Sequence, residues 1–541
     1  MKKPFAITLD VKSSLANHTG NWRTERPEYL DRQPPCNAAC PAGEQIQAWL
    51  YDGEDGNYER AWRRLVVDNP FPAVMGRVCY HPCQTACNRA QLDEAVGINS
   101  VERFLGDEAI RQGWTLAAPA ADTGYRVLVV GAGPSGLSAA YQLRMLGHQV
   151  EIRDAAEQAG GMMRYAIPTF RLPRDVLDAE LGRLLALGIT MRLGRRVDDV
   201  AAELAGGGFD AAFLAVGAQL SRRAYIPAGQ SAKVIDALSL LARVAQGERP
   251  VLGRRVVVYG GGNTAMDAAR TARRLGAEEA LVVYRRTRDR MPANEIEVSE
   301  ALGEGVQIRW LSTITAAAGG SITVERMELD ADGHPQPTGE LEQLSDDALI
   351  LALGQQVDNQ LLDELAGVDV EQGTVAVDAN LMTGHRGVFA GGDMVPGERS
   401  VATAIGHGSR AAKAIHTWLS GESAPSQPPV RPATFDLLNP WYYSEAPRTV
   451  RPRLDEARRV ADFGEVVGGL TPDTALFEAR RCLSCGNCFG CDNCYGMCPD
   501  NAISKVAGGH GYAIDYEYCK GCGICVAECP CGAIEMVPEQ S

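Results

Sequence analysis

The chain has 541 residues, 45% hydrophobic and 22% charged, which indicates a globular protein of three or four domains. Its net charge of −15 argues against nucleic acid or an anionic membrane as the main partner. No apolar run approaches the ~18 residues of a membrane span. The N-terminal stretch MKKPFAITLDVKSS lacks the apolar segment of a signal peptide, so we expect a cytoplasmic protein.

Sixteen cysteines fall into two groups, five between residues 36 and 87 and eleven between residues 482 and 531. A disulfide framework is unusual in a long cytosolic chain, whereas clustered CxxC spacings are typical of metal ligation. We therefore interpret both groups as iron–sulfur ligands, with structural zinc as the alternative.

The segment RVLVVGAGPSGLSAAYQLRMLGHQVEIRD, residues 126–154, predicts a strand, a glycine-rich turn, a helix and a second strand. Gly131 permits the turn, Gly133 lets a pyrophosphate approach the helix N-terminus, and Gly136 allows close packing of helix and strand. Asp154 is placed to bind a ribose hydroxyl. The expected dinucleotide contacts are Gly131, Gly133, Pro134, Ser135, Gly136 and Asp154.

A second stretch, RRVVVYGGGNTAMDAARTARRLG at 254–276, repeats this plan. Its second strand leads into arginines where an acid would select NAD(H). An arginine there can hold the 2′-phosphate of NADP(H) bidentately, so we expect NADP(H), with NAD(H) as the alternative. A solvated loop or a protein docking face is the other interpretation of these arginines. The expected contacts are Gly260, Gly262, Asn263, Thr264, Ala265, Arg285 and Arg286.

Further stretches predict how these two folds connect. FLAVGA (213–218) and LILALGQ (349–355) look like strand-to-loop crossovers between two nucleotide domains. GVFAGGDMVPGERSVATAI (387–405) predicts a short strand, a turn at Asp393 and a long helix from about Val401. This stretch resembles disulfide-reductase-like flavoproteins, in which such an aspartate binds the flavin ribityl chain and the helix N-terminus faces the flavin carbonyl. The resemblance implies that the positive end of the helix would stabilise an anionic reduced flavin. We interpret His407 as an ordinary helix position rather than a nucleotide contact.

The C-terminal cysteines repeat the bacterial two-cluster pattern CxxCxxCxxxCP twice. Three cysteines of each run wrap one cubane and the fourth ligates the other cluster. One [4Fe–4S] cluster is expected from Cys488, Cys491, Cys494 and Cys529. The other is expected from Cys498, Cys519, Cys522 and Cys525. Cys531 is left over, and we interpret it as a buried free thiol.

The stretches GGMMRYAIPTFRLPRDVLDAE (160–180), GGGNTAMDAARTARRLGAEEALVVYRRTRDRMPA (260–293) and GGDMVPGERSVATAI (391–405) show a family resemblance. They resemble the small (beta) subunit of NADPH-dependent glutamate synthase. They are also similar to the NADPH half of dihydropyrimidine dehydrogenase and to the large subunit of NADH-dependent ferredoxin:NADP oxidoreductase. The resemblance implies flavin contacts from Gly161, Arg164, Gly392, Asp393, Thr403 and Ala404.

For the N-terminal cysteines, the resemblance implies a helical domain with two [4Fe–4S] clusters. Cys40, Cys79, Cys83 and Cys87 match one complete ligand set. The other set normally takes two cysteines from an upstream RCLxCG motif, which in this chain stands instead at 481–486. We therefore expect Cys482 and Cys485 to fold back beside Cys36, with Glu102 as the fourth ligand. The alternative is that Cys482 and Cys485 only extend the ferredoxin loop.

The fold class that follows is α/β, with two nested Rossmann-like domains for FAD and NADPH between a helical Fe–S domain and a ferredoxin-like α+β domain. The Pro-rich stretch at 421–434 predicts a tether and TPDTALFEARRC a helical strut. The expected domains are 1–120 (helical Fe–S), 121–240 and 366–420 (FAD), 241–365 (NAD(P)H), 421–480 (linker and strut) and 481–541 (ferredoxin-like).

These elements predict an oxidoreductase subunit with FAD, NADP(H) and four [4Fe–4S] clusters, because a flavin can exchange both hydrides and single electrons. CKGCGICVAECPCGAIEM resembles the delta subunit of 2-oxoacid:ferredoxin oxidoreductases, which makes such an enzyme the favoured partner in a hetero-oligomer. The alternatives are free ferredoxin as acceptor, a glutamate synthase small subunit serving a separate large subunit, and a non-enzymatic relay with a dead nucleotide site.

Overall fold

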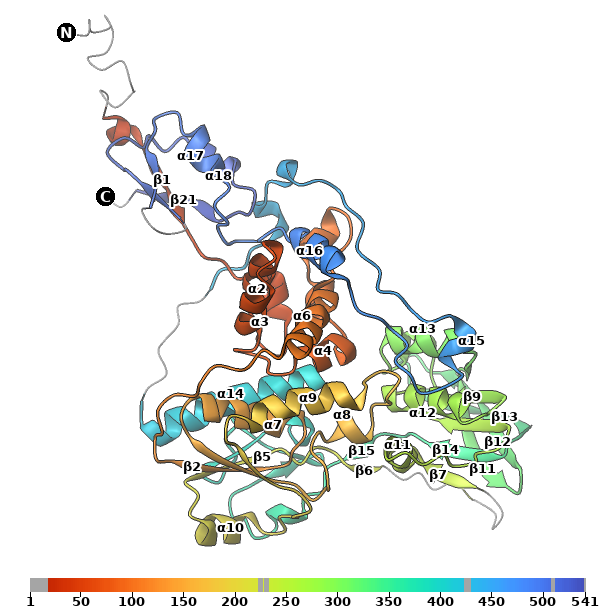
Figure 1. Ribbon diagram of the computed structural model, residues 1–541. Helices are drawn as coiled ribbons and strands as arrows, with labels where there is room; N and C mark the ends of the chain where they lie inside the picture. Colours follow the sequence, from red (N-terminus) through yellow and green to blue (C-terminus); the bar gives the residue numbers. More distant parts are fainter. Residues whose placement is uncertain (1–17, 222–226, 228–232, 423–429, 507–510, 540–541) are drawn as a thin grey trace, which may run out of the picture.

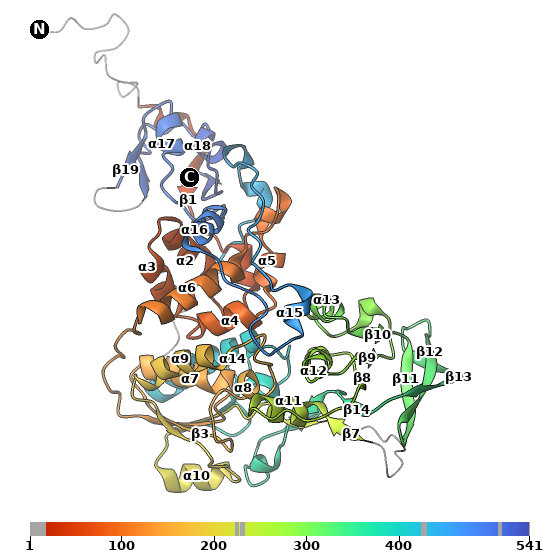
Figure 2. The same ribbon diagram turned by 45° about the vertical axis from the view of Figure 1, so that its right-hand side comes forward.

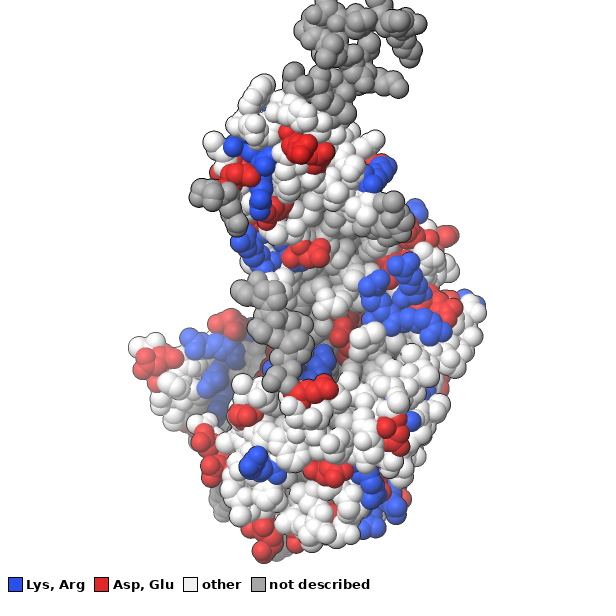
Figure 3. All heavy atoms as spheres, turned by 90° about the vertical axis from the view of Figure 1, so that its left-hand side faces the viewer, with Lys and Arg blue, Asp and Glu red and all other residues white. Residues whose placement is uncertain are grey.

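The computed structural model describes residues 18–221, 227, 233–422, 430–506 and 511–539. Part of the expected tether and the N-terminal stretch MKKPFAITLDVKSS therefore lie outside the described residues. Figure 1 shows four bodies: two sheet domains side by side, a helical domain above them and a small module at the far end. No described helix is long and apolar enough to cross a bilayer. On the face in Figure 3, acidic and basic side chains are interspersed.

The first nucleotide domain is a parallel five-stranded sheet with helices on its faces. Its strand order is β18 (Val388–Ala390), β5 (Ala211–Leu214), β2 (Arg126–Val130), β3 (Gln149–Arg153) and β4 (Thr190–Arg192). Apolar side chains from both faces are buried, as a parallel sheet requires. The packed helices include α7 (Pro134–Met145), α9 (Arg174–Leu185) and α14 (Val401–Ser420).

The second nucleotide domain is inserted between strands β5 and β18 of the first, as the sequence predicts. Its parallel order is β10 (Gln307–Arg309), β9 (Glu279–Val283), β8 (Arg255–Tyr259), β14 (Ala348–Leu351) and β7 (Val234–Asp236). Its helices are α11 (Ala237–Ala245), α12 (Asn263–Arg274) and α13 (Glu295–Gly303). Two crossover strands, β6 (Leu220–Ser221) and β15 (Gln355–Gln356), pair antiparallel between the domains.

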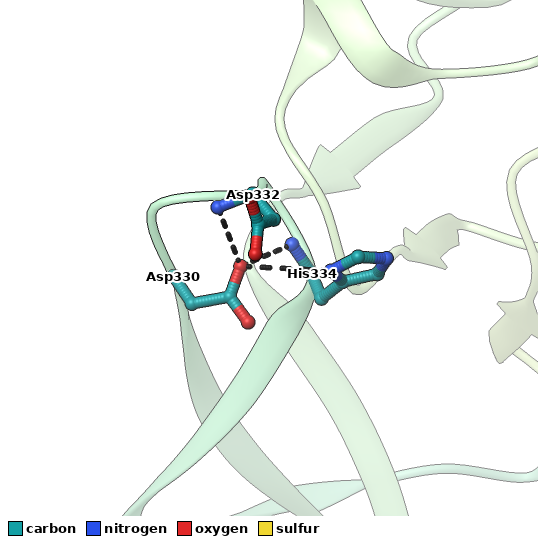
Figure 4. A group of neighbouring side chains, drawn as sticks. All are labelled: Asp330, Asp332 and His334. Carbon is teal, nitrogen blue, oxygen red and sulfur yellow. Dashed lines mark hydrogen bonds and ion pairs between the residues drawn. The ribbon is translucent and has the colours of Figure 1, made fainter.

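An antiparallel sheet of β11 (Ser312–Ala318), β12 (Ser321–Leu329) and β13 (Pro335–Ser345) extends from the second domain. Figure 4 shows three polar side chains at its β12–β13 turn. The Asp330 carboxylate accepts the backbone N–H groups of Asp332 at 3.1 Å and His334 at 2.7 Å. These hydrogen bonds account for the cluster, because an aspartate at this position typically organises a turn.

The helical domain contains α1 (Pro35–Ala39), α2 (Ile46–Glu54), α3 (Tyr58–Leu65), α4 (Pro72–Val78), α5 (Pro82–Thr85) and α6 (Ile98–Gln112). Glycines let α4 and α6 approach closely, since a Cβ on Gly76 would lie 2.3 Å from the Arg103 Cα. The Glu180 carboxylate, from α9 of the FAD domain, accepts the Ala73 and Val74 N–H groups. This contact fixes the helical domain on the FAD domain.

The C-terminal segment returns to the helical domain through α16 (Pro472–Arg480), where the sequence predicts a helical strut. Ala475 and Ala479 are fully buried in the core formed by α2, α3 and α6. Figures 1 and 2 both place α16 between that core and the end module. The strut therefore carries the residues after Arg480 back to the N-terminal cysteines.

The end module contains α17 (Asn493–Met497), β19 (Ile503–Lys505), β20 (Tyr512–Ile514), α18 (Ile524–Ala527) and β21 (Ile534–Pro538). An N-terminal strand, β1 (Glu25–Tyr29), pairs antiparallel with β21. Upstream, the Gly20 N–H donates to the Glu517 carbonyl at 2.8 Å. Residues 19–29 thus pack on the ferredoxin-like module, although the predicted N-terminal domain of 1–120 includes them.

Candidate functional site

A cavity of about 760 Å³ lies between the two nucleotide domains. Both glycine-rich turns and both crossover loops line it, together with the start of α14. Fourteen of the expected nucleotide contacts line this cavity: Gly133, Pro134, Ser135, Asp154, Gly161, Gly260, Gly262, Asn263, Thr264, Arg285, Arg286, Gly392, Asp393 and Ala404.

The FAD end of the cavity fits a dinucleotide. A Cβ on Gly133 would meet nothing nearer than the Gly161 Cα at 3.9 Å, so the backbone at the α7 N-terminus is open to a pyrophosphate. The Ser135 hydroxyl is buried without a hydrogen-bond partner among the described residues. Such an orphaned polar group indicates a missing ligand. Burial raises the pKa of Asp393.

Other expected residues support the turns from behind. A Cβ on Gly131 would lie 2.3 Å from the Ala215 carbonyl oxygen, and one on Gly136 would lie 1.9 Å from the Gly131 oxygen. Gly260 repeats this arrangement against Ala352 at 2.1 Å. Ala265 is fully buried in α12. These residues set the close approach of helix and sheet. Gly131, Gly136 and Ala265 do so without lining the cavity, whereas Gly260 also lines it.

Two expected flavin contacts lie away from the cavity lining. The Arg164 guanidinium turns back to donate to the Ala159 carbonyl at 2.5 Å and to pair with Asp178. The Thr403 backbone N–H and hydroxyl pair with Ser400, the N-cap of α14. Their local hydrogen bonds hold the structure around the site, and direct flavin contact by either residue stays a prediction.

His407 supports the flavin-side turn. Its ring is buried, and Nδ1 accepts the Gly392 N–H at 3.1 Å. Burial lowers its pKa, which keeps that nitrogen an acceptor at neutral pH. His407 lies fifteen residues after Gly392, and no motif in the sequence indicates this contact.

At the NADP end, Arg285 and Arg286 line the cavity and form no ion pair with a carboxylate of the described chain. Arg286 Nε is also buried without a partner there. The nearby Arg288, by contrast, pairs with Glu295. Two uncompensated guanidinium groups suit the 2′-phosphate that distinguishes NADP(H) from NAD(H).

We expect Arg285→Ala and Arg286→Ala each to raise the KM for NADPH by about 10- to 100-fold, because each removes hydrogen bonds to a charged group. The KM for NADH should change little. Steady-state reduction of a viologen dye measures both constants, and Arg288→Ala is the matched control. Equal effects on NADH and NADPH would contradict the assignment.

One small buried cavity brings the two ends of the chain together. The cysteines that line it are Cys36, Cys87, Cys482 and Cys485. Burial, followed by the nearby Cys482 and Cys87 sulfurs, raises the pKa of Cys36. The Asn88 amide donates to the Cys485 sulfur at 3.5 Å. Four converging sulfurs are the donor set that a [4Fe–4S] cluster requires.

The remaining N-terminal cysteines form a second group with a carboxylate. Its members are Cys40, Cys79, Cys83 and Glu102. Glu102 is buried, and burial followed by the neighbouring Glu44 raises its pKa. The Asn69 amide donates to Glu102 at 3.0 Å and to Glu44 at 2.9 Å. No motif in the sequence indicated that Glu44 belongs beside this group.

The expected assignment of these ligands is therefore wrong for two residues. Cys87 lies with Cys36, Cys482 and Cys485, and Glu102 lies with Cys40, Cys79 and Cys83. Cys83 lies within α5 and Cys87 beyond its end, as the N-cap of the following 3-10 turn. That helix end carries Cys87 to the side of Cys36, while Glu102 projects from α6 toward Cys79. Sequence spacing alone does not show on which side of a short helix the next ligand emerges.

In the end module, Cys498, Cys519, Cys522 and Cys525 line one cavity. Cys529 instead lies near Cys488 and Cys491. Burial raises the pKa of both thiols, and the nearby Cys529 sulfur raises it further. The fourth cysteine of each run thus crosses to the other group, as the pattern predicts. Cys531 is buried, with its sulfur 3.8 Å from that of Cys529.

The N-terminal strand also reaches a ligand of this module. The Tyr29 hydroxyl donates to the Cys494 sulfur at 3.1 Å, and its ring stacks on Tyr512 with centroids 6.1 Å apart. A hydrogen bond to a ligating sulfur stabilises the more negative, reduced state of a cluster.

Tyr29→Phe is therefore expected to shift the midpoint potential of the cluster held by Cys494 to a more negative value. A redox titration followed by electron paramagnetic resonance measures this potential. Tyr58→Phe, which removes a hydroxyl donating to the Pro472 carbonyl, is the control. An unchanged midpoint in Tyr29→Phe would show that the hydroxyl does not tune the cluster.

Comparison with known proteins identifies three matching family models. The pyridine nucleotide-disulphide oxidoreductase model matches residues 122–408. The dihydropyrimidine dehydrogenase domain II 4Fe-4S model matches residues 27–114, and the 4Fe-4S dicluster model matches residues 487–533.

Three curated relatives align with most of the chain. The NADP(+)-dependent formate dehydrogenase subunit beta of Moorella thermoacetica is 36% identical over 83% of this chain and 70% of its own. The NADPH-Fe(3+) oxidoreductase subunit beta of Geobacter sulfurreducens is 31% identical over 84% and 76%. The glutamate synthase [NADPH] small chain of Azospirillum brasilense is 33% identical over 72% and 87%.

Proposed function

The chain belongs to the pyridine nucleotide-disulphide oxidoreductase family and is an FAD/iron–sulfur electron-transfer subunit, and on this premise we propose that it carries electrons between NADP(H) and a separate partner through FAD and four [4Fe–4S] clusters. Bound flavin would exchange a hydride with nicotinamide and single electrons with the clusters. The chain's own residues bind, orient and insulate these groups.

The order of the ligand groups supports this route. Val78 and Tyr80 line the nucleotide cavity and flank Cys79, so the group with Glu102 adjoins this cavity. We call Cys36, Cys87, Cys482 and Cys485 the shared group, because both ends of the chain contribute to it. The short segment from Cys83 to Cys87 connects the group with Glu102 to the shared group. Cys485 and Cys488 connect the shared group to the end module in the same way. This unbroken succession is the observation that carries the proposal.

The partner receives or supplies single electrons at the end module. The resemblance of this module to a delta subunit favours a 2-oxoacid:ferredoxin oxidoreductase. The name of the Moorella relative favours a formate-oxidising subunit as the second candidate. Purification of the tagged chain from its native cell, with identification of stoichiometric subunits, separates these two from a glutamate synthase large chain.

The function itself is tested on the isolated holoprotein by anaerobic stopped-flow spectroscopy. NADPH should bleach the flavin absorbance within milliseconds to seconds, and paramagnetic signals of reduced clusters should follow. A flavin that binds but is not bleached by NADPH or NADH would support the non-enzymatic relay instead.

A further inference from the structure

An exposed aromatic surface lies on the C-terminal segment where it crosses the end module. Trp441 is 87% exposed, whereas Trp49 and Trp62 of the helical domain are fully buried. Tyr442 and Leu437 beside it are also exposed. We call Leu437, Trp441 and Tyr442 the aromatic patch. Exposed apolar side chains gathered in one short segment are typical of interaction sites.

The aromatic patch is held in place by hydrogen bonds. Between its members, Asn439 donates from Nδ2 to the Ala527 carbonyl at 2.8 Å and from its backbone to the Pro530 carbonyl at 3.2 Å. Leu438 is buried under it. A patch fixed in this way loses little conformational entropy when a partner binds.

The same anchors place the patch beside an expected cluster. The Tyr442 hydroxyl donates to Glu528, the residue before Cys529. The Asn493 amide, two residues after Cys491, donates to the Glu528 carbonyl at 3.2 Å. Cys488 and Cys491 are themselves exposed. The patch therefore borders the edge of the module where ligands of one cluster reach the surface.

Acidic residues border the patch: Asp436 precedes Leu437, Glu445 follows Tyr442 by three residues, and the Glu528 carboxylate accepts the Tyr442 hydroxyl. Asp436, Glu445 and Glu528 form no ion pair with the described residues, in contrast to Glu535, which pairs with Arg32 and Arg431. An uncompensated acidic rim around exposed aromatics is complementary to an apolar pocket bordered by lysine or arginine.

We propose that the aromatic patch is the docking surface for the redox partner subunit, a protein with a basic-rimmed apolar pocket and its own one-electron centre. This inference rests on the proposed function. In each transfer toward the partner, one electron leaves the cluster at Cys488 and Cys491 and reduces the partner's centre. Two such transfers balance the oxidation of one NADPH to NADP⁺ and a proton.

The test uses the tagged chain expressed in its native cell. Trp441→Ala should weaken the complex by about 30-fold or more, the loss typical of a central aromatic anchor, and should deplete the stoichiometric partner subunits. Trp22→Ala, at another tryptophan that is 71% exposed, is the matched control. Asp436→Lys with Glu445→Lys should slow association and reduce its dependence on salt.

A second measurement locates the contact. Amides of residues 437–442 should exchange hydrogen more slowly in the purified complex than in the isolated holoprotein. Full partner retention in Trp441→Ala, or unchanged exchange at 437–442, would overturn the docking surface. NADPH-dependent flavin bleaching should be the same in every variant. If NADPH did not bleach the flavin of the wild-type chain, the proposed function would be overturned instead. Failure of the docking surface and failure of the proposed function are therefore distinguishable.

Discussion

Replacing Cys482 and Cys485 together by alanine is expected to lower the iron content from about sixteen to about twelve atoms per chain, the loss of one [4Fe–4S] cluster. Both sulfurs line the cavity shared with Cys36 and Cys87, and two remaining thiolates do not hold a cubane. The nucleotide cavity contains neither residue, so NADPH should still bleach the flavin. Reduction of the clusters in the end module should be abolished.

Iron analysis, stopped-flow absorbance and electron paramagnetic resonance together measure this outcome. Cys531→Ala is the matched control, because Cys531 is also a buried cysteine of the C-terminal segment but lines neither of the two cysteine cavities. A double variant that keeps sixteen irons would show that the two thiols only extend the ferredoxin loop. Loss of all clusters would show instead that the shared group is needed for folding.

Arg481→Ala is expected to weaken the packing of the strut helix α16 on the helical domain. The free energy of unfolding should fall by about 3–5 kcal/mol, the cost of breaking a buried charge network. Arg481 is 2% exposed. It pairs with Glu478 at 2.6 Å and Asp93 at 3.1 Å. It also donates to the backbone carbonyls of Ala446, Ala95 and Glu94. Its removal leaves the fully buried Glu478 carboxylate with two backbone N–H donors but no countercharge.

Urea unfolding followed by the fluorescence of the buried Trp49 and Trp62 measures this loss, with limited proteolysis of residues 445–470 as a second readout. Arg480→Ala is the control, since Arg480 is exposed and, among the residues that the structure describes, donates only to the Glu54 carbonyl. It should change stability by no more than about 0.5 kcal/mol. Equal effects of the two variants would mean that the network does not hold the strut.

The local parts of this protein were predictable from its sequence. The two glycine-rich turns, the positions of their strands and helices, and the crossing of Cys498 and Cys529 follow from short spacings. In each case a few neighbouring residues are sufficient, because a turn or a CxxC loop is determined by its own backbone. Through the family resemblance, the RCLxCG motif at 481–486 also indicated that the two ends of the chain meet.

Tertiary structure decided which distant groups share a site. The exchange of Cys87 and Glu102 depends on where α5 ends and which way α6 faces. The pairing of β1 with β21, which brings Tyr29 to Cys494, joins residues from opposite ends of the chain. The inward turn of Arg164 depends on Asp178 from the next helix. Contacts of this kind depend on how whole helices and strands pack together. The spacing of residues along the chain does not determine them.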